Sequence, residues 1–467
     1  MKWEHIIKNG QVYADGHFVN AHLYIKDGKI AAISDEDLGE AAVVTDAAGL
    51  LVLPGMIDTH VHSRDPHATY KEDFYHSTMA AAVGGITCIF EMPNSNPPIA
   101  NVENLQKQVK NLSDKANVDF AIWGGAYGDL NRDDLLPLSE AGVIGFKFFW
   151  GYAINKKDYS LVYSYKAGMP DVIPPLDDGE VLAMFKDINP TGQCLAIHAE
   201  NSEIMARLSA QVREEGRSDY QALLDGRPAL AEAATVGLAI QYAKHTGTHL
   251  HVLHVTSKDA VELIRWAKLD GVPVTAETCP HYLFLTNEDF EHLGNMMKVY
   301  PPIKYQEDQD ALWEGLQDGT LTSVCSDHAP HTQEEKQVNL FDAPAGACGV
   351  ETMVPMMLDA VNEGRITLDE MVALLSENPA KQFGLYPRKG VIAVGADADL
   401  TIVDMDKEKV LRQEDLHSVN KVTPFNGFKV KGVPVMTVVR GKLVAKDGEL
   451  VSEKNGQFVK PCLEEFL

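Results

Sequence analysis

The fold is decided by the stretch Gly55-Met56-Ile57-Asp58-Thr59-His60-Val61-His62, which follows the apolar run Leu50-Leu51-Val52-Leu53. Side chains two residues apart in a β-strand point to the same face, so both imidazoles can reach one metal ion at the strand's end. An apolar run of this kind indicates a strand buried on both faces, and barrel enzymes keep their polar, reactive residues at the C-terminal ends of such strands. Because the chain contains 17 histidines, a chance pair on the surface or in the core is the alternative.

Apolar or β-prone runs recur along the middle of the chain, with helical patterns between them. Ser257, for example, is suited to cap a helix whose apolar face carries Val261 and Ile264. Eight strands with intervening helices favour an α/β fold of the (β/α)8 barrel type, although periodicity alone leaves a doubly wound sheet open. The eight runs span residues 51–58, 86–92, 118–124, 143–149, 194–198, 250–255, 272–277 and 322–327.

Both ends of the chain consist of short β-like segments separated by turn signals. Asp15-Gly16 and Asp27-Gly28 are hairpin cues near the N-terminus, and residues 398–403 and 435–441 are β-prone near the C-terminus. We therefore expect residues 1–53 and 386–467 to build one small β-sandwich domain together. The barrel then comprises residues 54–385.

Composition excludes several classes of partner. The formal net charge of -26 argues against nucleic acid and anionic membranes, which attract basic surfaces. The N-terminus lacks a signal-peptide pattern and no run of 18 apolar residues occurs, so a cytoplasmic location is the default expectation. The six cysteines are far apart without a Cys-x-x-Cys motif, and we expect reduced core residues.

Lys147 lies in the almost wholly apolar fourth run, residues 143–149. Lysine is seldom fully buried unless it is paired, and the alternative is an ammonium that reaches the surface along its aliphatic stem. Burial favours the neutral amine, which can react with carbon dioxide to give an anionic carbamate. Such a group can bridge two cations.

Three further strand ends carry candidate ligands: His198, His254 and Asp327. His251 faces the opposite way from His254 in a strand, so we assign it an ordinary structural role. Core histidines and a turn aspartate are the alternatives.

Four imidazoles, a carboxylate and a bridging anion suit two divalent ions, with zinc favoured over manganese or cobalt. Two such ions activate water and polarise a carbonyl, which is the chemistry of amide or ester hydrolysis.

The chain resembles the cyclic amidohydrolases of the amidohydrolase superfamily: hydantoinase, allantoinase, dihydropyrimidinase and dihydroorotase. The resemblance runs from Pro54-Gly55-Met56-Ile57-Asp58 to the glycine-punctuated segment at residues 390–400. It implies a homo-oligomer, a dimer or tetramer, that acts on a small cyclic amide. It also implies His60 and His62 on one metal ion, His198 and His254 on the other, carboxylated Lys147 between them, Asp327 as ligand and proton shuttle, and Tyr152 as oxyanion stabiliser, with a packing role as the alternative for Tyr152.

The substrate is indicated by motifs that point in two directions. Residues 277–282 and 423–427 look like allantoinase and L-hydantoinase. In contrast, Arg64, Asn94 and His331 match dihydroorotase residues that hold the substrate carboxylate; a surface ion pair for Arg64 and a turn for Asn94 are the alternatives. His67 departs from the pattern of the dihydroorotases that the chain resembles. Tyr300 also departs, because the matching position looks like Asn in dihydroorotases and Ser in hydantoinases.

The expected function is therefore metal-dependent opening of the ring amide of a cyclic ureide, hydantoin or allantoin-like. Dihydroorotase is the alternative. A non-catalytic scaffold of the same fold is less favoured, because all six metal-ligand positions are filled.

Overall fold

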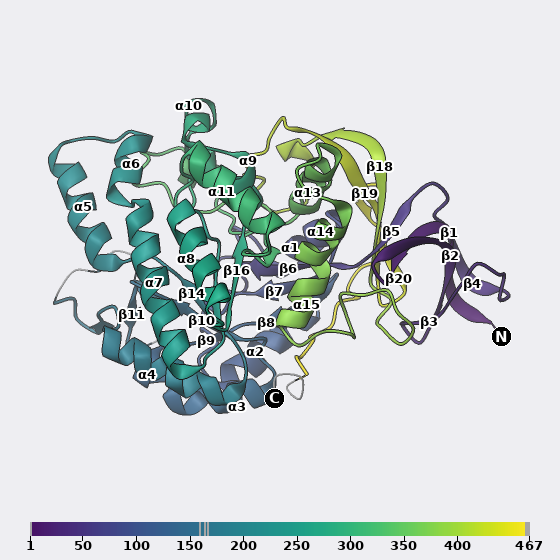
Figure 1. The fold of residues 1–467 in the computed structure, drawn as a ribbon, viewed down its shortest axis with the longest axis horizontal. Coiled ribbons are helices and arrows are strands. Elements are labelled where there is room, and N and C mark those ends of the chain that lie inside the picture. Colours follow the sequence, from purple (N-terminus) through teal and green to yellow (C-terminus); the bar gives the residue numbers. More distant parts are fainter. Residues whose placement is uncertain (1, 158–159, 163–164, 166–167, 463–467) are drawn as a thin grey trace.

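The computed structural model describes residues 2–157, 160–162, 165 and 168–462. The molecule has two parts that lie side by side (Figure 1). Helices surround the strands from the middle of the chain in one part, and strands from the two chain ends lie together in the other. Within the described residues, no helix combines the length and apolarity needed to cross a membrane.

The barrel is a ring of parallel strands formed by two hydrogen-bonded sheets, β6-β7-β8 and β9-β10-β14-β15-β16-β17. Only Trp123 separates β8 from β9, and a parallel bridge between Val61 and His328 joins the first strand to the segment after the last. When β8 and β9 are counted as one position, the ring contains eight strand positions, and the predicted (β/α)8 fold is confirmed. Its strands are β6 (Met56–Val61), β7 (Ile86–Glu91), β8 (Asp119–Ile122), β9 (Gly124–Gly125), β10 (Phe146–Phe149), β14 (Leu195–His198), β15 (Leu250–Val252), β16 (Val274–Thr278) and β17 (Ser323–Val324).

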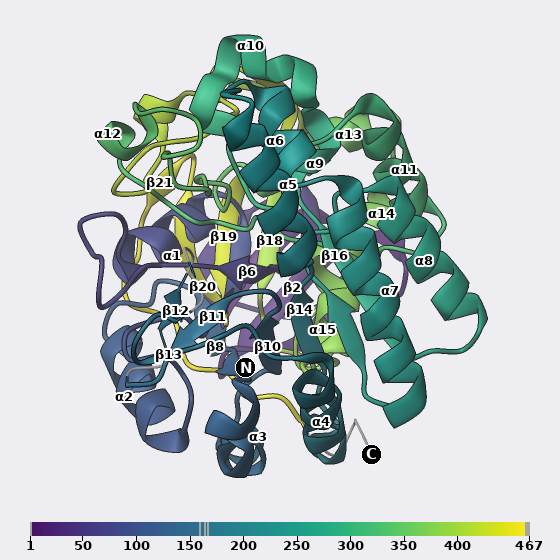
Figure 2. The same ribbon diagram turned by 90° about the vertical axis from the view of Figure 1, so that its left-hand side faces the viewer.

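Helices cover the outside of this ring (Figure 2). Ser257 caps α8 as expected, because its side chain accepts a hydrogen bond from the backbone N–H of Ala260. The helices are α1 (Phe74–Val83), α2 (Val102–Ser113), α3 (Leu135–Ala141), α4 (Asp178–Ile188), α5 (Ser202–Glu214), α6 (Tyr220–Gly226), α7 (Ala229–Thr246), α8 (Lys258–Leu269), α9 (Pro280–Phe284), α10 (Phe290–Leu293), α11 (Gln306–Gln317), α12 (Gln333–Lys336), α13 (Met353–Asn362), α14 (Leu368–Val372) and α15 (Asn378–Gln382). A small sheet of β11 (Ala153–Asn155), β12 (Leu161–Val162) and β13 (Val172–Ile173) lies between β10 and α4 in the chain.

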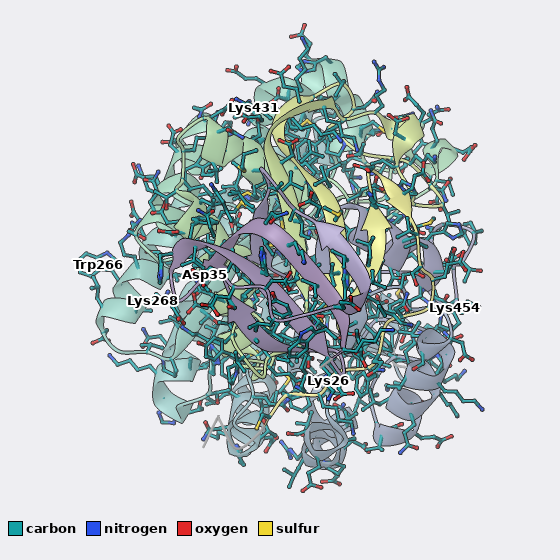
Figure 3. The ribbon with its side chains drawn as sticks, turned by 90° about the vertical axis from the view of Figure 1, so that its right-hand side faces the viewer. Lys26, Asp35, Trp266, Lys268, Lys431 and Lys454 are labelled. Atoms are coloured by element: carbon teal, nitrogen blue, oxygen red, sulfur yellow. The ribbon has the colours of Figure 1, made fainter. Side chains whose placement is uncertain are left out.

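The two chain ends share one nine-stranded sheet, ordered β21-β20-β19-β18-β5-β1-β2-β3, with β4 paired to β1. Figure 3 views the molecule from this side, with the purple N-terminal strands beside the yellow C-terminal ones. A separate apolar cluster, including Leu23, Val52 and Val438, draws its members from both ends and gives this sandwich-like part its own core. The strands are β1 (Trp3–Ala14), β2 (His17–Lys26), β3 (Lys29–Ser34), β4 (Ala41–Asp46), β5 (Leu51–Pro54), β18 (Leu400–Val410), β19 (Lys429–Val439), β20 (Lys442–Lys446) and β21 (Glu449–Leu450).

The expected single strand at residues 51–58 is two strands in the structure. β5 pairs with β1 and β18 in the terminal sheet, whereas β6 belongs to the barrel. The break falls at Gly55, where a Cβ atom would lie only 2.2 Å from Oγ1 of Thr87 and 2.9 Å from Cβ of Asp399. The chain passes from one part to the other through a gap that has room only for glycine.

The last described residues leave the terminal sheet and run beside the barrel. The backbone N–H of Phe120 on β8 donates to Gln457 O at 3.0 Å, and Val459 N–H donates to Phe120 O at 2.8 Å. The domain bounds expected from the sequence stay a prediction. Cys462 in this tail is exposed, so the expectation of a core cysteine is wrong at that position, while the other five cysteines are buried and free.

Candidate metal centre

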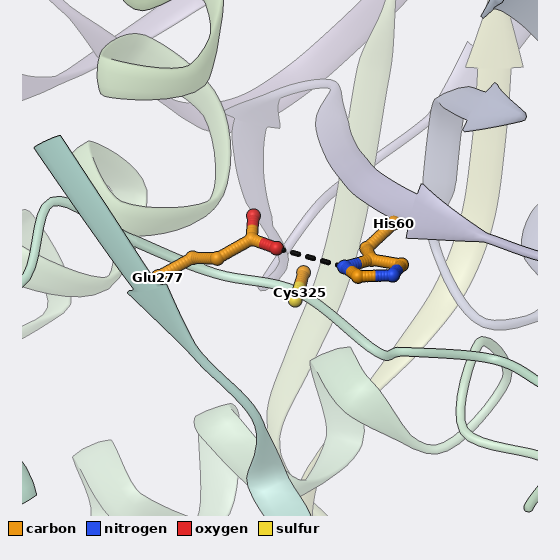
Figure 4. Close-up of side chains that lie close together, drawn as sticks. All are labelled: His60, Glu277 and Cys325. Carbon is orange, nitrogen blue, oxygen red and sulfur yellow. Dashed lines mark hydrogen bonds and ion pairs between the residues drawn. The ribbon is translucent and has the colours of Figure 1, made fainter. Parts of the chain in front are cut away.

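His60 lies near the end of β6 and His62 directly follows it, and both imidazoles are oriented by a side-chain oxygen. Nδ1 of His60 lies 3.0 Å from Oε1 of Glu277 (Figure 4), and Nδ1 of His62 lies 2.9 Å from Oδ1 of Asn94. The opposite nitrogens face one carboxylate, because His60 Nε2 lies 3.4 Å and His62 Nε2 3.8 Å from Oδ1 of Asp327. The expected strand geometry therefore brings these two histidines and the aspartate to one point.

This group has the spacing of metal ligands. One ligand atom each from His60, His62 and Asp327 lie within 4.8 Å of one another. Tetrahedral zinc with bonds of about 2.0–2.1 Å to nitrogen separates neighbouring ligand atoms by about 3.3 Å. A hydrogen bond from the remote imidazole nitrogen to a carboxylate or amide is the usual support of a ligating histidine. The donors present fit a divalent ion with little movement.

His198 at the end of β14 and His254, two residues after the end of the neighbouring strand β15, form a second pair. Nδ1 of His198 lies 3.0 Å from Nε2 of His254, and Nε2 of His198 lies 2.9 Å from Oε2 of Glu200. Burial lowers the pKa of His198 to about 4, despite the nearby Glu200 carboxylate. Neutral imidazole is the form that metal ions bind, so this pair also fits a cation.

Lys147 lies on β10 and is 1% exposed. Burial lowers its pKa to about 7, although the charges of Asp327 and Glu277 act in the opposite direction. Burial is the largest cause that lowers the pKa of His62, His198 and His254, and the charge of Lys147 lowers these three pKa values further. The Lys147 ammonium thus acts electrostatically on both histidine pairs, and its role as a ligand between them stays a prediction.

Asp327 follows β17 and is held in an uncommon backbone conformation. Its φ is 44°, that of His254 is 37° and that of Arg64 is 62°, all in the left-handed region. Such conformations cost about 1–3 kcal/mol each and gather at functional sites. Burial raises the pKa of Asp327, while His60 and Lys147 act against that rise.

Glu277 is a site residue to which the sequence reasoning gave no role. Besides its contact with His60, it accepts a hydrogen bond from Oγ1 of Thr59, and its Oε2 lies 3.3 Å from Nε2 of His251. Burial alone would raise the pKa of Glu277, but the hydrogen bonds from His251 and His60 hold it below its usual range. An acid within the buried strand β16 was the sequence signal that could have found it. His251, assigned a structural role, supports this acid.

The residues expected to act on the substrate have different neighbours in the structure. Arg64 Nη2 is 3.3 Å from Nε2 of His331, so these two are together. Asn94 instead contacts His62, as described above, which gives it a positioning contact that the sequence did not predict. Tyr152 lies with its ring centroid 5.4 Å from that of His198 and its hydroxyl 3.5 Å from Nη2 of Arg227. Substrate contacts for all of them stay predictions.

A (β/α)8 barrel with paired histidines, a buried lysine and an aspartate at its strand ends defines a barrel hydrolase of the kind that uses divalent metal. The model of the amidohydrolase family matches residues 51–444, and the chain belongs to this family.

Named relatives and solved structures match almost the whole chain. An L-hydantoinase of Paenarthrobacter aurescens is 37% identical over 461 residues, which cover 97% of both chains. An allantoinase of Bacillus licheniformis is 34% identical and covers 98% of this chain and 100% of its own. The structure of the L-hydantoinase (dihydropyrimidinase) from Arthrobacter aurescens superposes with a TM-score of 0.91 at 36% identity, covering 98% of this chain and 100% of that one.

Proposed function

We propose that the protein is a metal-dependent hydrolase that opens the ring amide of a cyclic ureide, hydantoin or allantoin-like. The observation that carries this proposal is the convergence of His60, His62 and Asp327 beside the pair His198 and His254. The relatives named L-hydantoinase and allantoinase support the substrate class.

The proposed centre would hold two divalent ions, zinc by preference. His60 and His62 would hold one ion and His198 and His254 the other, with Asp327 as a further ligand. When bound, such ions polarise a carbonyl and lower the pKa of water.

Carboxylation of Lys147 completes this ligand set. Four neutral imidazoles and one carboxylate leave two divalent ions short of anionic ligands, and an unmodified amine cannot bridge them. Lys147 is buried on the strand next to His198, since the register pairs it with Ala196 on β14. A carbamate on its amine supplies the missing negative charge.

The protein's own groups then perform the proton transfers and the positioning. Asp327 accepts the proton of the attacking water and delivers it to the ring nitrogen as the amide bond breaks. The hydroxyl of Tyr152 donates a hydrogen bond to the oxygen that becomes negative in the tetrahedral intermediate. The amide of Asn94 would keep the His62 ring oriented toward the metal ion during the reaction.

Dihydroorotase activity is the second candidate, and the contact between Arg64 and His331 favours it. A guanidinium beside an imidazole is suited to a carboxylate, and a bidentate pair with arginine is a specific one. Arg64→Ala should then raise the KM for dihydroorotate by more than about tenfold, as expected for the loss of a charged hydrogen bond. An unchanged KM for every substrate would make Arg64 structural and remove this candidate.

A side-by-side assay of ring opening tests the proposed function. Zinc-loaded protein should open hydantoins or allantoin faster than dihydroorotate. The opposite order would establish the alternative, and no turnover of any cyclic ureide would refute the proposal.

A cytoplasmic location and a dimeric or tetrameric assembly also stay proposals.

A further inference from the structure

Arg227 is a partly buried arginine outside the expected ligand set, at the junction between α6 and α7. Its side chain is only 14% exposed and pairs with Glu200, whose side chain is 2% exposed. Nε of Arg227 donates to Oε1 of Glu200 at 3.0 Å, and Nη2 donates to Oε2 of the same carboxylate. This is the two-pronged geometry that fixes a carboxylate in one orientation.

The oriented carboxylate acts directly on a predicted metal ligand. Oε2 of Glu200 lies 2.9 Å from Nε2 of His198, and Nδ1 of the same ring faces His254. A partner on one imidazole nitrogen decides which nitrogen carries the proton and where the other one points. Arg227 therefore contacts Glu200, and Glu200 contacts the His198 ring that carries the predicted ligand atom.

The same guanidinium touches two tyrosines. Nη2 lies 3.5 Å from the hydroxyl of Tyr152, and the guanidinium carbon lies 3.5 Å from the centre of the Tyr300 ring. A cation stacked this closely on an aromatic face is attracted by the ring and held flat against it. Tyr300 occupies the position where the sequence departs from the small Ser or Asn of the families it resembles, and a small side chain would leave this face of Arg227 unsupported.

We propose that Arg227 is a positioning residue for the ring-opening reaction. It holds Glu200 against His198, and it places a positive charge beside the hydroxyl of Tyr152. The ring of Tyr300 is the platform that keeps the guanidinium in this place. This inference rests on the proposed function for its second part, since only a reacting amide develops the negative oxygen that Tyr152 would meet.

The first test measures zinc affinity of the metal-free full-length protein by competition with a chelator. Arg227→Gln should weaken binding of one of two zinc ions by about tenfold, the low end of the effect of losing a partner behind a ligand, because Glu200 stays but loses the group that orients it. Arg365→Gln is the matched control, because Arg365 also pairs with a glutamate, Glu363 at 2.8 Å, and lies 5.4 Å from an aromatic ring, that of Trp313, outside the site. Two zinc ions bound by Arg227→Gln at wild-type affinity would overturn the proposal.

The second test separates kcat from KM at saturating zinc. Arg227→Gln should lower kcat about tenfold with little change in KM, because a misplaced oxyanion donor weakens transition-state binding. Tyr300→Ser removes the ring but changes neither residue of the ion pair, and it should lower kcat more than Tyr300→Phe, which keeps the ring. The Tyr300 variants carry the test if Arg227→Gln does not fold. Equal kcat in the two Tyr300 variants, or a change in KM alone, would contradict the platform.

The zinc-affinity test can fail independently of the proposed function, whereas the kcat test needs a protein that opens a cyclic ureide. Wild-type protein that binds two zinc ions and opens no cyclic ureide contradicts the proposed function alone. In that case the zinc affinity of Arg227→Gln still decides whether Arg227 positions His198.

Discussion

Nδ1 of His198 lies 3.0 Å from Nε2 of His254, although 56 residues separate the two in the chain. Among the described residues, only His198 of this pair has a hydrogen-bonding partner on its far side. Glu200 supports His198, whereas Nδ1 of His254 is buried without a partner among the described residues. The orientation of the His198 ring therefore depends on Glu200, and the two facing nitrogens, which hydrogen-bond to each other, are the atoms that a metal ion held by this pair would use.

Glu277→Ala should reduce zinc affinity by about 10–100-fold, because His60 loses the carboxylate that orients its ring. Chelator competition with metal-free protein measures this. Glu351→Ala is the matched control, since Glu351 is also a buried acid paired with a histidine, His417 at 3.1 Å. An equal loss of affinity in both variants would show a general effect of removing buried acids and none specific to His60.

Asp327→Asn should keep the fold and lower kcat by about 10²–10⁴-fold, the contribution typical of a positioned acid or base. The amide fills the same space but cannot accept a proton from water. Steady-state kinetics on protein with its zinc content measured separates loss of proton transfer from loss of metal. Near-normal turnover with two zinc ions bound would remove Asp327 as proton shuttle.

Lys147→Ala should lose both metal and activity, and a small carboxylic acid such as acetate or propionate should restore part of the turnover. The physical reason is that the buried space left by the side chain admits a carboxylate that replaces the proposed bridge. Mass spectrometry of the native wild-type protein should find the added carboxyl group on Lys147. A lysine of unmodified mass in protein with two bound ions contradicts the carbamate.

Gly55→Ala should destabilise the protein by about 1–3 kcal/mol, the range for overpacking a filled site. The new methyl group would lie 2.2 Å from Oγ1 of Thr87, so the barrel and terminal sheet must move apart. Gly237→Ala is the control within α7, where the nearest atom is 3.7 Å away, and it should stabilise by about 0.4–1 kcal/mol. Thermal unfolding measures both, and equal stability of Gly55→Ala and wild type would show that the gap adapts.

The barrel and the gathering of its ligand candidates could be predicted because each candidate stands at the end of an apolar strand. That local pattern places His60 and His62 on one face and Asp327 at the same rim. The strand break at Gly55 does not follow from the apolar run at residues 51–58, although the expected boundary between the two parts, at residues 53 and 54, lies beside it. The close approach of Thr87 and Asp399, which only the tertiary structure reveals, explains why glycine stands at this position.

The residues behind the ligands were harder to find for a similar reason. Glu277 is 217 residues from His60, and Arg227 is 75 residues from Tyr152. No spacing in the sequence connects such pairs. The amide of Asn94 also turns toward His62, a contact set by the fold of the loop after β7 rather than by its own motif.

The central claim is that bound metal at the strand ends enables this protein to open a cyclic ureide. Titration of metal-free protein with zinc, followed by the rate of hydantoin or allantoin ring opening, tests it most directly. The account predicts no turnover without metal and a rate that rises until two equivalents of zinc are bound. Full turnover in the metal-free protein, or two bound zinc ions with no ring opening of any cyclic ureide, would contradict it.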